Sequence, residues 1–257
     1  MNIRYFAGCA LEWPLNRLLR SPWFPLLHTF HARQNWLYDI CRYANTRRFR
    51  VLFDVGANIG QTAVSMHGYF PDAEIHAFEP VENTHRILCR NVRRWPTVRP
   101  HRLAMGRLCE SREIVLQDTS ELNSLRLSAP LDATAERRLE RIEVSTVDEF
   151  CDRHRIGGID VLKIDAQGCD LDVLLGAERM ISAKRVPFVF VEVGFQLNDI
   201  INSPFAPLDG HLTARGFGLC GFYNQTGCGQ RNAAPYLFFS DALYSHPDAL
   251  LHRFSGA

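Results

Sequence analysis

From residue 51 onward, short apolar runs alternate with longer segments in which apolar residues recur at helical spacing. The apolar runs contain few polar positions, which is typical of strands buried on both faces of a parallel sheet. We predict strands at 51–55, 75–78, 98–103, 142–146, 159–164, 187–193, 216–222 and 235–240, with short strands or loop at 113–117 and 124–127. Helices are predicted at 61–68, 81–95, 132–141, 147–155, 170–182 and 207–215. This order predicts an α/β fold with a doubly wound, mostly parallel sheet of the Rossmann-like type.

The first 50 residues differ in composition from the rest of the chain. They contain eight arginines, only two acidic residues, and three of the four tryptophans, Trp13, Trp23 and Trp36. Prolines divide this stretch into short helical pieces, and the longest predicted helix covers 29–44. We interpret the stretch as a helical cover that packs its aromatic side chains over the sheet. Peripheral contact with a membrane surface or an acidic ligand is the alternative.

The length and the composition of the chain indicate one α/β domain with a sizeable core. The chain has 257 residues, of which 22% are charged and 46% hydrophobic. We therefore predict an N-terminal helical segment at 1–50, one domain at 51–245, and a C-terminal tail at 246–257. A net charge of +1 gives no reason to expect a nucleic-acid partner.

Cysteine spacing and hydropathy bear on the compartment and on metals. The eight cysteines form no Cys-x-x-Cys pair, so we predict neither a zinc site nor a dithiol redox motif. Their scattered positions suit a reducing compartment. The chain has no apolar run of about 18 residues that could span a membrane. Its N-terminus lacks the apolar core and cleavage site of a signal peptide. We expect a cytoplasmic protein.

The turn after the first predicted strand carries the strongest functional signal. The strand 51–55 leads into Gly56 and Gly60, and a helix-compatible segment follows. Glycines let a ligand approach the backbone, and the N–H groups at a helix start offer hydrogen-bond donors. Glu79 follows the second strand, 23 residues beyond Gly56, where such sheets place an acid that accepts hydrogen bonds from ribose hydroxyls. The two features predict a nucleoside-bearing cofactor.

The residues of the turn indicate which cofactor is bound. The sequence Gly56-Ala57-Asn58-Ile59-Gly60 lacks the Gly-x-Gly-x-x-Gly pattern that holds a pyrophosphate. S-adenosylmethionine carries a carboxylate, an ammonium and a sulfonium but no phosphate. Asp54 supplies an acid near the loop, although an aspartate at this place can also simply cap the turn. We predict S-adenosylmethionine.

Three charged residues interrupt strands that should be apolar. Lys163 and Asp165 lie two positions apart, so they point to the same face near the carboxyl end of their strand. Glu192 occupies a similar place in the strand 187–193. Because the carboxyl ends of such strands form the ligand crevice, we name these three as candidate catalytic residues. The alternatives are a structural Lys163–Asp165 pair, and a Glu192 that pairs with Lys163 or with an N-terminal arginine.

The chain resembles the FkbM family of S-adenosylmethionine-dependent methyltransferases. The matching segments follow one another in the family's order over about residues 50–240. The matching segments are Asp54-Val-Gly-Ala-Asn-Ile-Gly60, Ala77-Phe-Glu-Pro80, Leu88 to Val92, Leu103-Ala-Met-Gly106, Asn123-Ser-Leu125, Thr146-Val-Asp-Glu-Phe150, Ile159 to Gly168, Leu174-Leu-Gly-Ala177 and Phe190-Val-Glu192. The resemblance implies a class I methyltransferase sheet. It also implies that the 54–60 loop holds the methionine portion, and that the ribose lies at Glu79 and Pro80 with the adenine beside Ala104 and Met105.

One position departs from the family pattern. Many members read Lys-Ile-Asp-Val-Glu-Gly, whereas this chain has Lys163-Ile-Asp-Ala-Gln-Gly168. Gln167 cannot act as a base, so any such role for that position is in doubt here. Asp165 is retained. Among the ten histidines we keep only His211 in reserve as a base.

The leading hypothesis is an O-methyltransferase that acts on a free hydroxyl of a glycan or a secondary metabolite. A hydroxyl nucleophile benefits from a carboxylate that takes its proton, and Asp165 and Glu192 are available. The first alternative is a nicotinamide-dependent oxidoreductase, which the missing glycine pattern disfavours. The absence of a Tyr-x-x-x-Lys pair also disfavours it, because Tyr43 is followed by Arg47. The second alternative is a non-catalytic module that binds the cofactor or a glycan.

Overall fold

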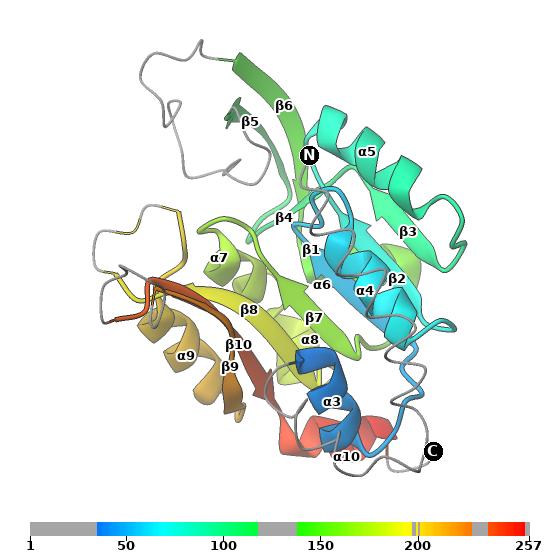
Figure 1. The fold of residues 1–257 in the computed structure, drawn as a ribbon, viewed down its shortest axis with the longest axis vertical. Coiled ribbons are helices and arrows are strands. Elements are labelled where there is room, and N and C mark those ends of the chain that lie inside the picture. The colour runs from blue at the N-terminus through cyan, green and yellow to red at the C-terminus, as the bar shows by residue number, and fades with distance from the viewer. Residues whose placement is uncertain (1–34, 118–137, 197–198, 200, 228–235, 255–257) are drawn as a thin grey trace.

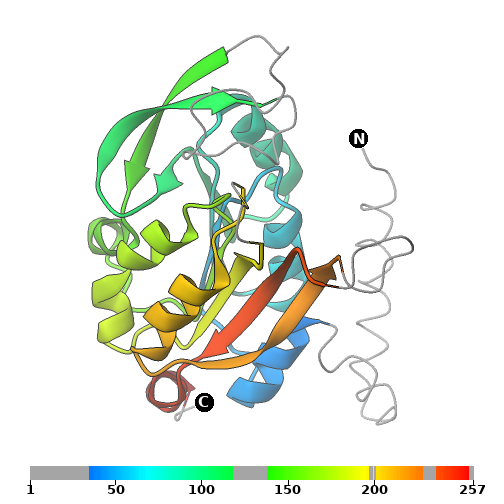
Figure 2. The same cartoon turned by 90° about the vertical axis from the view of Figure 1, so that its left-hand side faces the viewer.

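A seven-stranded sheet with helices on both faces forms the body of the protein (Figures 1 and 2). The computed structural model describes residues 35–117, 138–196, 199, 201–227 and 236–254. The strand order is β3-β2-β1-β7-β8-β10-β9, and β10 alone runs antiparallel to its neighbours. The strands are β1 (Val51–Val55), β2 (Glu74–Phe78), β3 (Val98–His101), β7 (Val161–Ile164), β8 (Phe188–Gly194), β9 (Gly218–Thr226) and β10 (Phe239–Ser245). The predicted doubly wound, mostly parallel sheet is confirmed.

The helices divide between two hydrophobic cores, one on each face of the sheet. One face is covered by α3 (Trp36–Ala44), α4 (Gln61–Tyr69), α5 (Glu82–Val92) and α10 (Pro247–Phe254). The other is covered by α6 (Val147–His154), α7 (Asp170–Leu175), α8 (Glu178–Ser182) and α9 (Phe205–Thr213). The side chains of each strand alternate between the two cores, so Phe53 packs on one side and Leu52 on the other. This explains why the central strands are mostly apolar on both faces.

The described part of the N-terminal segment, residues 35–50, packs on the sheet through α3. Trp36 stacks on Phe190 of β8 with ring centroids 4.1 Å apart. The Tyr223 hydroxyl of β9 donates a 2.7 Å hydrogen bond to buried Asp39, which fixes α3 across the sheet. The predicted start of this helix, 29–34, lies outside the described residues.

A second, three-stranded sheet stands beside the carboxyl end of the main one (Figure 1). It contains β4 (Ala104–Met105), β6 (Arg138–Ser145) and β5 (Glu110–Leu116), in the order β4-β6-β5. The predicted strand 98–103 was therefore too long, because the chain leaves the main sheet after His101 to enter β4. The segment predicted at 124–127 lies outside the described residues.

The helix predicted at 132–141 was wrong over its described part, because residues 138–141 belong to β6. This stretch is rich in charged residues, and an exposed helix was expected there. In β6 the charged residues alternate with Ile142 and Val144, which are buried in a small core shared with Ile114. Antiparallel pairing with β5 therefore decided the conformation, as cross-strand contacts commonly do.

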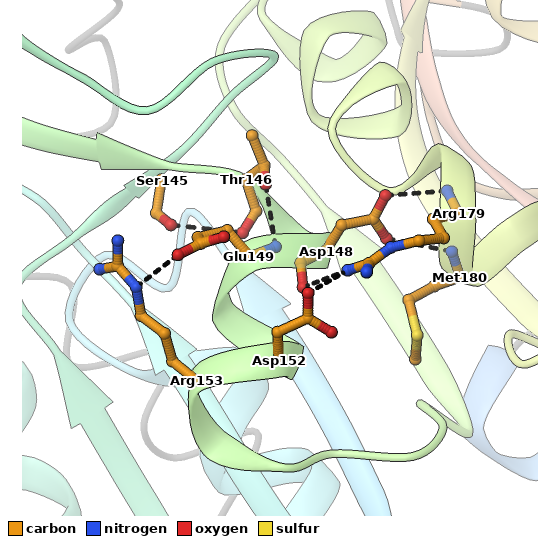
Figure 3. Close-up of polar contacts among 8 residues, drawn as sticks. All are labelled: Ser145, Thr146, Asp148, Glu149, Asp152, Arg153, Arg179 and Met180. Carbon is orange, nitrogen blue, oxygen red and sulfur yellow. Dashed lines mark hydrogen bonds and ion pairs between the residues drawn. The ribbon is translucent and has the colours of Figure 1, made fainter.

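The helix predicted at 170–182 is two helices, α7 and α8, that meet at Gly176. A Cβ at Gly176 would lie 2.1 Å from the Gly106 carbonyl oxygen, so the chain needs glycine at this contact. The second helix receives a cap from α6 (Figure 3). The Asp148 carboxylate accepts hydrogen bonds of 2.8 and 3.0 Å from the backbone N–H groups of Arg179 and Met180. This contact gives the Thr146–Phe150 motif a structural role.

Two elements near the C-terminus differ from expectation. The last strand, predicted at 235–240, is β10 at Phe239–Ser245, because Asp241 sits inside it rather than after it. The predicted C-terminal tail contains α10, whose Phe254 packs on Phe49 with ring centroids 5.2 Å apart. Arg253 of α10 also forms an ion pair with buried Asp160.

A buried histidine, His76, and a half-buried one, His101, lie on neighbouring strands of the sheet. Nδ1 of His76 in β2 and Nε2 of His101 in β3 lie 3.0 Å apart, and His101 stacks on Phe78. Burial is the main reason that the pKa of His76 is lowered to about 4 and that of His101 to about 3; Arg99 and His154 contribute to the first, and His76, His154 and Arg99 to the second. Two protonated rings would turn two N–H donors toward each other, which disfavours double protonation. Both pKa values lie well below 7, so both rings are neutral at pH 7.

We expect the replacement Asp148→Ala to remove the cap of α8 and to lower the free energy of unfolding by about 1–2 kcal/mol. Asp152→Ala is the matched control, because Asp152 contacts the same Arg179 through an exposed ion pair that contributes little. Urea unfolding measures both. Equal losses in the two variants would contradict the capping role.

We also expect stability to fall with pH below 6.5. The unfolded histidines bind protons near pH 6.5, whereas folded His76 and His101 do so only near pH 4 and pH 3. Each histidine therefore reduces stability by up to about 1.4 kcal/mol per pH unit as the pH falls through this window. Carbon-13 NMR of the histidine Cε1 atoms would show two resonances that do not titrate between pH 7 and 5. The protein unfolded in urea is the control. Titration of either ring near pH 6.5 in the folded protein would refute this.

Candidate functional site

A cleft opens at the carboxyl ends of β1, β2 and β7, beside the second sheet. This is the edge at which open α/β sheets bind ligands. Its described lining residues come from the ends of these strands, from β4 and from β5. They are Val55, Gly56, Asn58, Phe78, Glu79, Pro80, Val81, Leu103, Ala104, Met105, Ile114, Asp165, Ala166, Gln167 and Cys169. The structure therefore brings six of the nine predicted cofactor residues to one cleft, together with Asp165.

Glu79 supplies a buried acid at the end of β2. Its Oε1 accepts a 2.9 Å hydrogen bond from the Val81 N–H, and the Asn58 N–H also donates to this carboxyl. Burial raises the pKa of Glu79 to about 7, although the two backbone donors and Lys163 oppose the shift. The side chain is 8% exposed, and that exposed part lies in the cleft. An acceptor in such a place can bind hydroxyl groups of a ligand.

The loop after β1 is shaped by close contacts inside the protein. A Cβ at Gly56 would lie 1.8 Å from the Asp165 carbonyl oxygen, and the φ angle there is +71°. Gly60, with a φ of +96°, packs on Leu88 of α5 instead of lining the cleft. Buried Ala57 donates its N–H to the Phe78 carbonyl at 2.9 Å. These three residues hold the loop against β2, α5 and β7, and Gly56 also faces the cleft.

Asp54 is fully buried in an ion pair with Lys163. The Lys163 Nζ lies 2.9 Å from Asp54 Oδ1, across the neighbouring strands β1 and β7. The same ammonium donates to the carbonyl oxygens of Val55, at 3.3 Å, and Gly56, at 3.1 Å. Asp54 is 0% exposed, so its carboxylate orders the loop from beneath rather than facing the cleft.

Asp165 occupies the floor of the cleft with a side chain that is 34% exposed. Its Oδ2 lies 3.7 Å from Lys163 Nζ, and its Oδ1 accepts a 2.8 Å hydrogen bond from the Gln167 side-chain amide. A glutamate at position 167 would instead place a second carboxylate beside it. The departure from the family pattern thus gives Asp165 a donor.

Asp170 ties down the loop that carries Asp165 and Gln167. Its two carboxylate oxygens accept from the N–H groups of Ala166, at 2.8 Å, and Gly168, at 3.2 Å. The Ser203 hydroxyl adds a 2.7 Å hydrogen bond to Oδ2. Sequence reasoning missed Asp170 and Ser203. An aspartate at the first position of a predicted helix was the available signal.

Glu192 and His211 are not among the residues that line this cleft. Glu192, near the carboxyl end of β8, is half-buried and pairs in register with Asp241 of β10. His211 of α9 lies behind the other core, with its Nε2 3.8 Å from Glu178, so it does not reach the cleft. Sequence reasoning also missed Asp241, because the predicted last strand ended before it. Within the described ranges, no group of three or more side chains is arranged to hold a metal ion.

The cleft fits a nucleoside that carries no phosphate. Glu79 offers an acceptor for ribose hydroxyls, and Val81, Ala104, Met105 and Ile114 form an apolar wall for a flat base. The described lining contains no lysine or arginine that would meet a pyrophosphate. Within the described part of the chain, no helix is long and apolar enough to cross a membrane.

Solved structures with a similar fold are methyltransferases, at low identity. Fibrillarin from Aeropyrum pernix with bound S-adenosyl-L-methionine shares 14% identity at a TM-score of 0.44, covering 77% of this chain and 66% of that one. The N-terminal domain of human METTL16 with SAH shares 12% identity at a TM-score of 0.44, and the match covers 82% of this chain and 67% of that one. Precorrin-6y C5,15-methyltransferase from Geobacter metallireducens shares 10% identity at a TM-score of 0.43, and the match covers 81% of this chain and 86% of that one. This chain thus spans about two thirds of the length of the first two.

The sequence itself identifies the family. No curated protein matches the chain. The profile of the methyltransferase FkbM domain matches residues 54–219, which run from the buried aspartate of β1 into β9. The match covers more than half of the chain and includes every strand end that forms the cleft. The chain therefore belongs to the FkbM family of methyltransferases, and its cofactor is S-adenosyl-L-methionine.

Proposed function

We propose that the protein transfers a methyl group from S-adenosylmethionine to a hydroxyl oxygen of a glycan or secondary metabolite. The observation that carries this proposal is the place of Asp165. Its carboxylate lies in the same cleft as Glu79, is open to solvent on one side, and is held from behind by Lys163 and Gln167. A carboxylate so placed can accept the proton of an attacking hydroxyl.

Methyl transfer asks mainly for geometry from the protein. The cofactor supplies a methyl group on a sulfonium, which is already activated toward attack. Gly56 and Asn58 of the 54–60 loop line the cleft and would contact one end of the cofactor, and the Gly56 backbone contacts the Asp165 backbone directly. Asp165 would therefore stand close to the methyl group and could both orient and deprotonate the acceptor. Lys163 is a positioning residue, since it is 6% exposed and its hydrogen bonds run to Asp54 and the loop carbonyls.

The nucleoside part would lie against the second sheet. We assign the ribose hydroxyls to Glu79, with Pro80 beside them, and the adenine to Ala104 and Met105. Ile114 of β5 extends the same wall. We place the reaction in the cytoplasm, a proposal supported by the six free cysteines that the structure describes.

Methyl incorporation from methyl-labelled S-adenosylmethionine into a panel of hydroxylated glycans and natural products tests the proposed reaction. Asp165→Asn should lower turnover by about 10²- to 10⁴-fold while the cofactor affinity stays nearly the same. Asp172→Asn, which removes an exposed acid from nearby α7, is the matched control.

Two other results for Asp165→Asn would each contradict this role. A lower melting temperature with unchanged turnover would make Asp165 a structural partner of Lys163. Loss of cofactor affinity in calorimetry, with folding intact, would move Asp165 into the cofactor site. Labelled product that carries its methyl on nitrogen or carbon would overturn the proposed O-methylation itself.

The role of Glu79 has a test of its own. We expect 5′-methylthioadenosine, which has the ribose but no amino-acid group, to bind more tightly at pH 8 than at pH 6. The reason is that Glu79 accepts from both ribose hydroxyls as a carboxylate, and its pKa is about 7. Glu79→Gln should weaken binding at pH 8 by about ten- to a hundredfold and remove the pH dependence. Calorimetry measures both.

Dideoxyadenosine, which lacks both ribose hydroxyls, is the ligand control for this experiment. Its affinity should be the same for the wild-type protein and the variant at either pH. Unchanged binding of 5′-methylthioadenosine to a folded Glu79→Gln protein would show that Glu79 does not contact the ribose.

A further inference from the structure

Glu192 lies one strand away from Asp165 at the carboxyl edge of the sheet. The register of β7 and β8 pairs Ile164 with Val191, and Asp165 and Glu192 are the next residues on the two strands. Across the other edge of β8, Glu192 is directly opposite Asp241. Side chains that face each other in this way on antiparallel strands have Cβ atoms about 5 Å apart. Glu192 thus stands between two acids.

Among the described residues, the cation near Glu192 is Lys163, and its N–H donors are directed elsewhere. The alternative partner, an arginine of residues 1–34, lies outside the described residues. An ammonium has three N–H donors. Those of Lys163 are directed to Asp54 and to the carbonyl oxygens of Val55 and Gly56. Asp241 differs from Glu192 in its hydrogen bonding, because the Asn224 side-chain amide donates a 2.6 Å hydrogen bond to Asp241 Oδ2. Of the two facing acids, Asp241 therefore has a donor that suits a carboxylate.

Glu192 Oε2 is buried and meets no hydrogen-bond donor among the residues that the structure describes. A buried carboxylate oxygen without a donor is costly, whereas a protonated carboxyl is tolerated. Within the described ranges, the charged groups that act on Glu192 are Asp165 after β7, Asp241 of β10, Asp170 of α7 and Lys163 of β7. Burial, together with the three acids, raises the pKa of Glu192 above its usual range, and Lys163 opposes this only in part.

We infer, on the basis of the proposed function, that Glu192 carries a proton and donates a hydrogen bond to a second oxygen of the acceptor. The negative charge of Asp241 keeps Glu192 protonated. Glu192 is then a binding group rather than a second base, and Asp165 alone takes the proton. The arrangement fits acceptors with two neighbouring oxygens, such as a vicinal diol or a hydroxyl beside a carbonyl. Asp165 would receive one oxygen and Glu192 the other.

The protonation state can be measured on the protein alone. In the wild-type protein labelled with carbon-13 at the glutamate side chains, one carboxyl resonance should titrate above pH 7, and Glu192→Gln should remove it. Asp241→Asn removes the facing charge and should lower the titration midpoint by about one pH unit. Asp248→Asn, which removes an exposed acid at the opposite end of the sheet, should leave the midpoint unchanged. A Glu192 midpoint below pH 6 would overturn the inference.

The methyl-transfer kinetics of two variants test whether Glu192 acts as a hydrogen-bond donor. The acceptor is the compound that the panel of hydroxylated glycans and natural products identifies. Glu192→Gln keeps a donor and should retain turnover within about threefold. Glu192→Ala should raise the acceptor KM by about tenfold or more, because the acceptor oxygen loses its partner. Equal, large losses of kcat in both variants would make Glu192 a base and refute the inference. A high midpoint in a protein that transfers no methyl group would refute the proposed function and leave the protonation of Glu192 established.

Discussion

The buried ion pair between Lys163 and Asp54 is the interaction on which the site depends. It joins the two central strands of the sheet at the point where both end in functional loops. Removing one partner of such a pair leaves an uncompensated charge and typically costs about 3–5 kcal/mol. The same ammonium donates to the carbonyl oxygens of Val55 and Gly56, and the Val55 carbonyl also accepts from the Asp165 N–H at 3.1 Å. The conformation of the loop after β1 therefore depends on a residue of another strand.

Much of the fold could be predicted because its central strands are buried on both faces. β1 matched its predicted bounds, and β2, β7 and β8 were each placed to within two residues. Errors arose where tertiary contacts outweighed local pattern. Charged β6 is a strand because it pairs with β5, and the long helix after β7 is divided by a glycine contact and a cap from α6.

The candidate site was predicted unevenly, for a related reason. Residues that interrupt an apolar strand, such as Lys163 and Glu192, stand out in the sequence. Residues that hold others in place do not, since their partners are far away along the chain. Asp170 and Ser203 are 33 residues apart and meet only in the fold. Asp241 was overlooked because a polar residue was read as the end of a strand rather than as part of it.

The contact between Gly56 and the Asp165 backbone has a consequence for how such an enzyme can diversify. The spacing between the loop after β1 and the loop that carries Asp165 is set by main chain against main chain, with no side chain in between. Substitutions elsewhere around the acceptor can change which molecule is accepted without altering that spacing. Gly56 itself has no freedom to vary. Over evolution, the chemistry would stay constant while the acceptor changes.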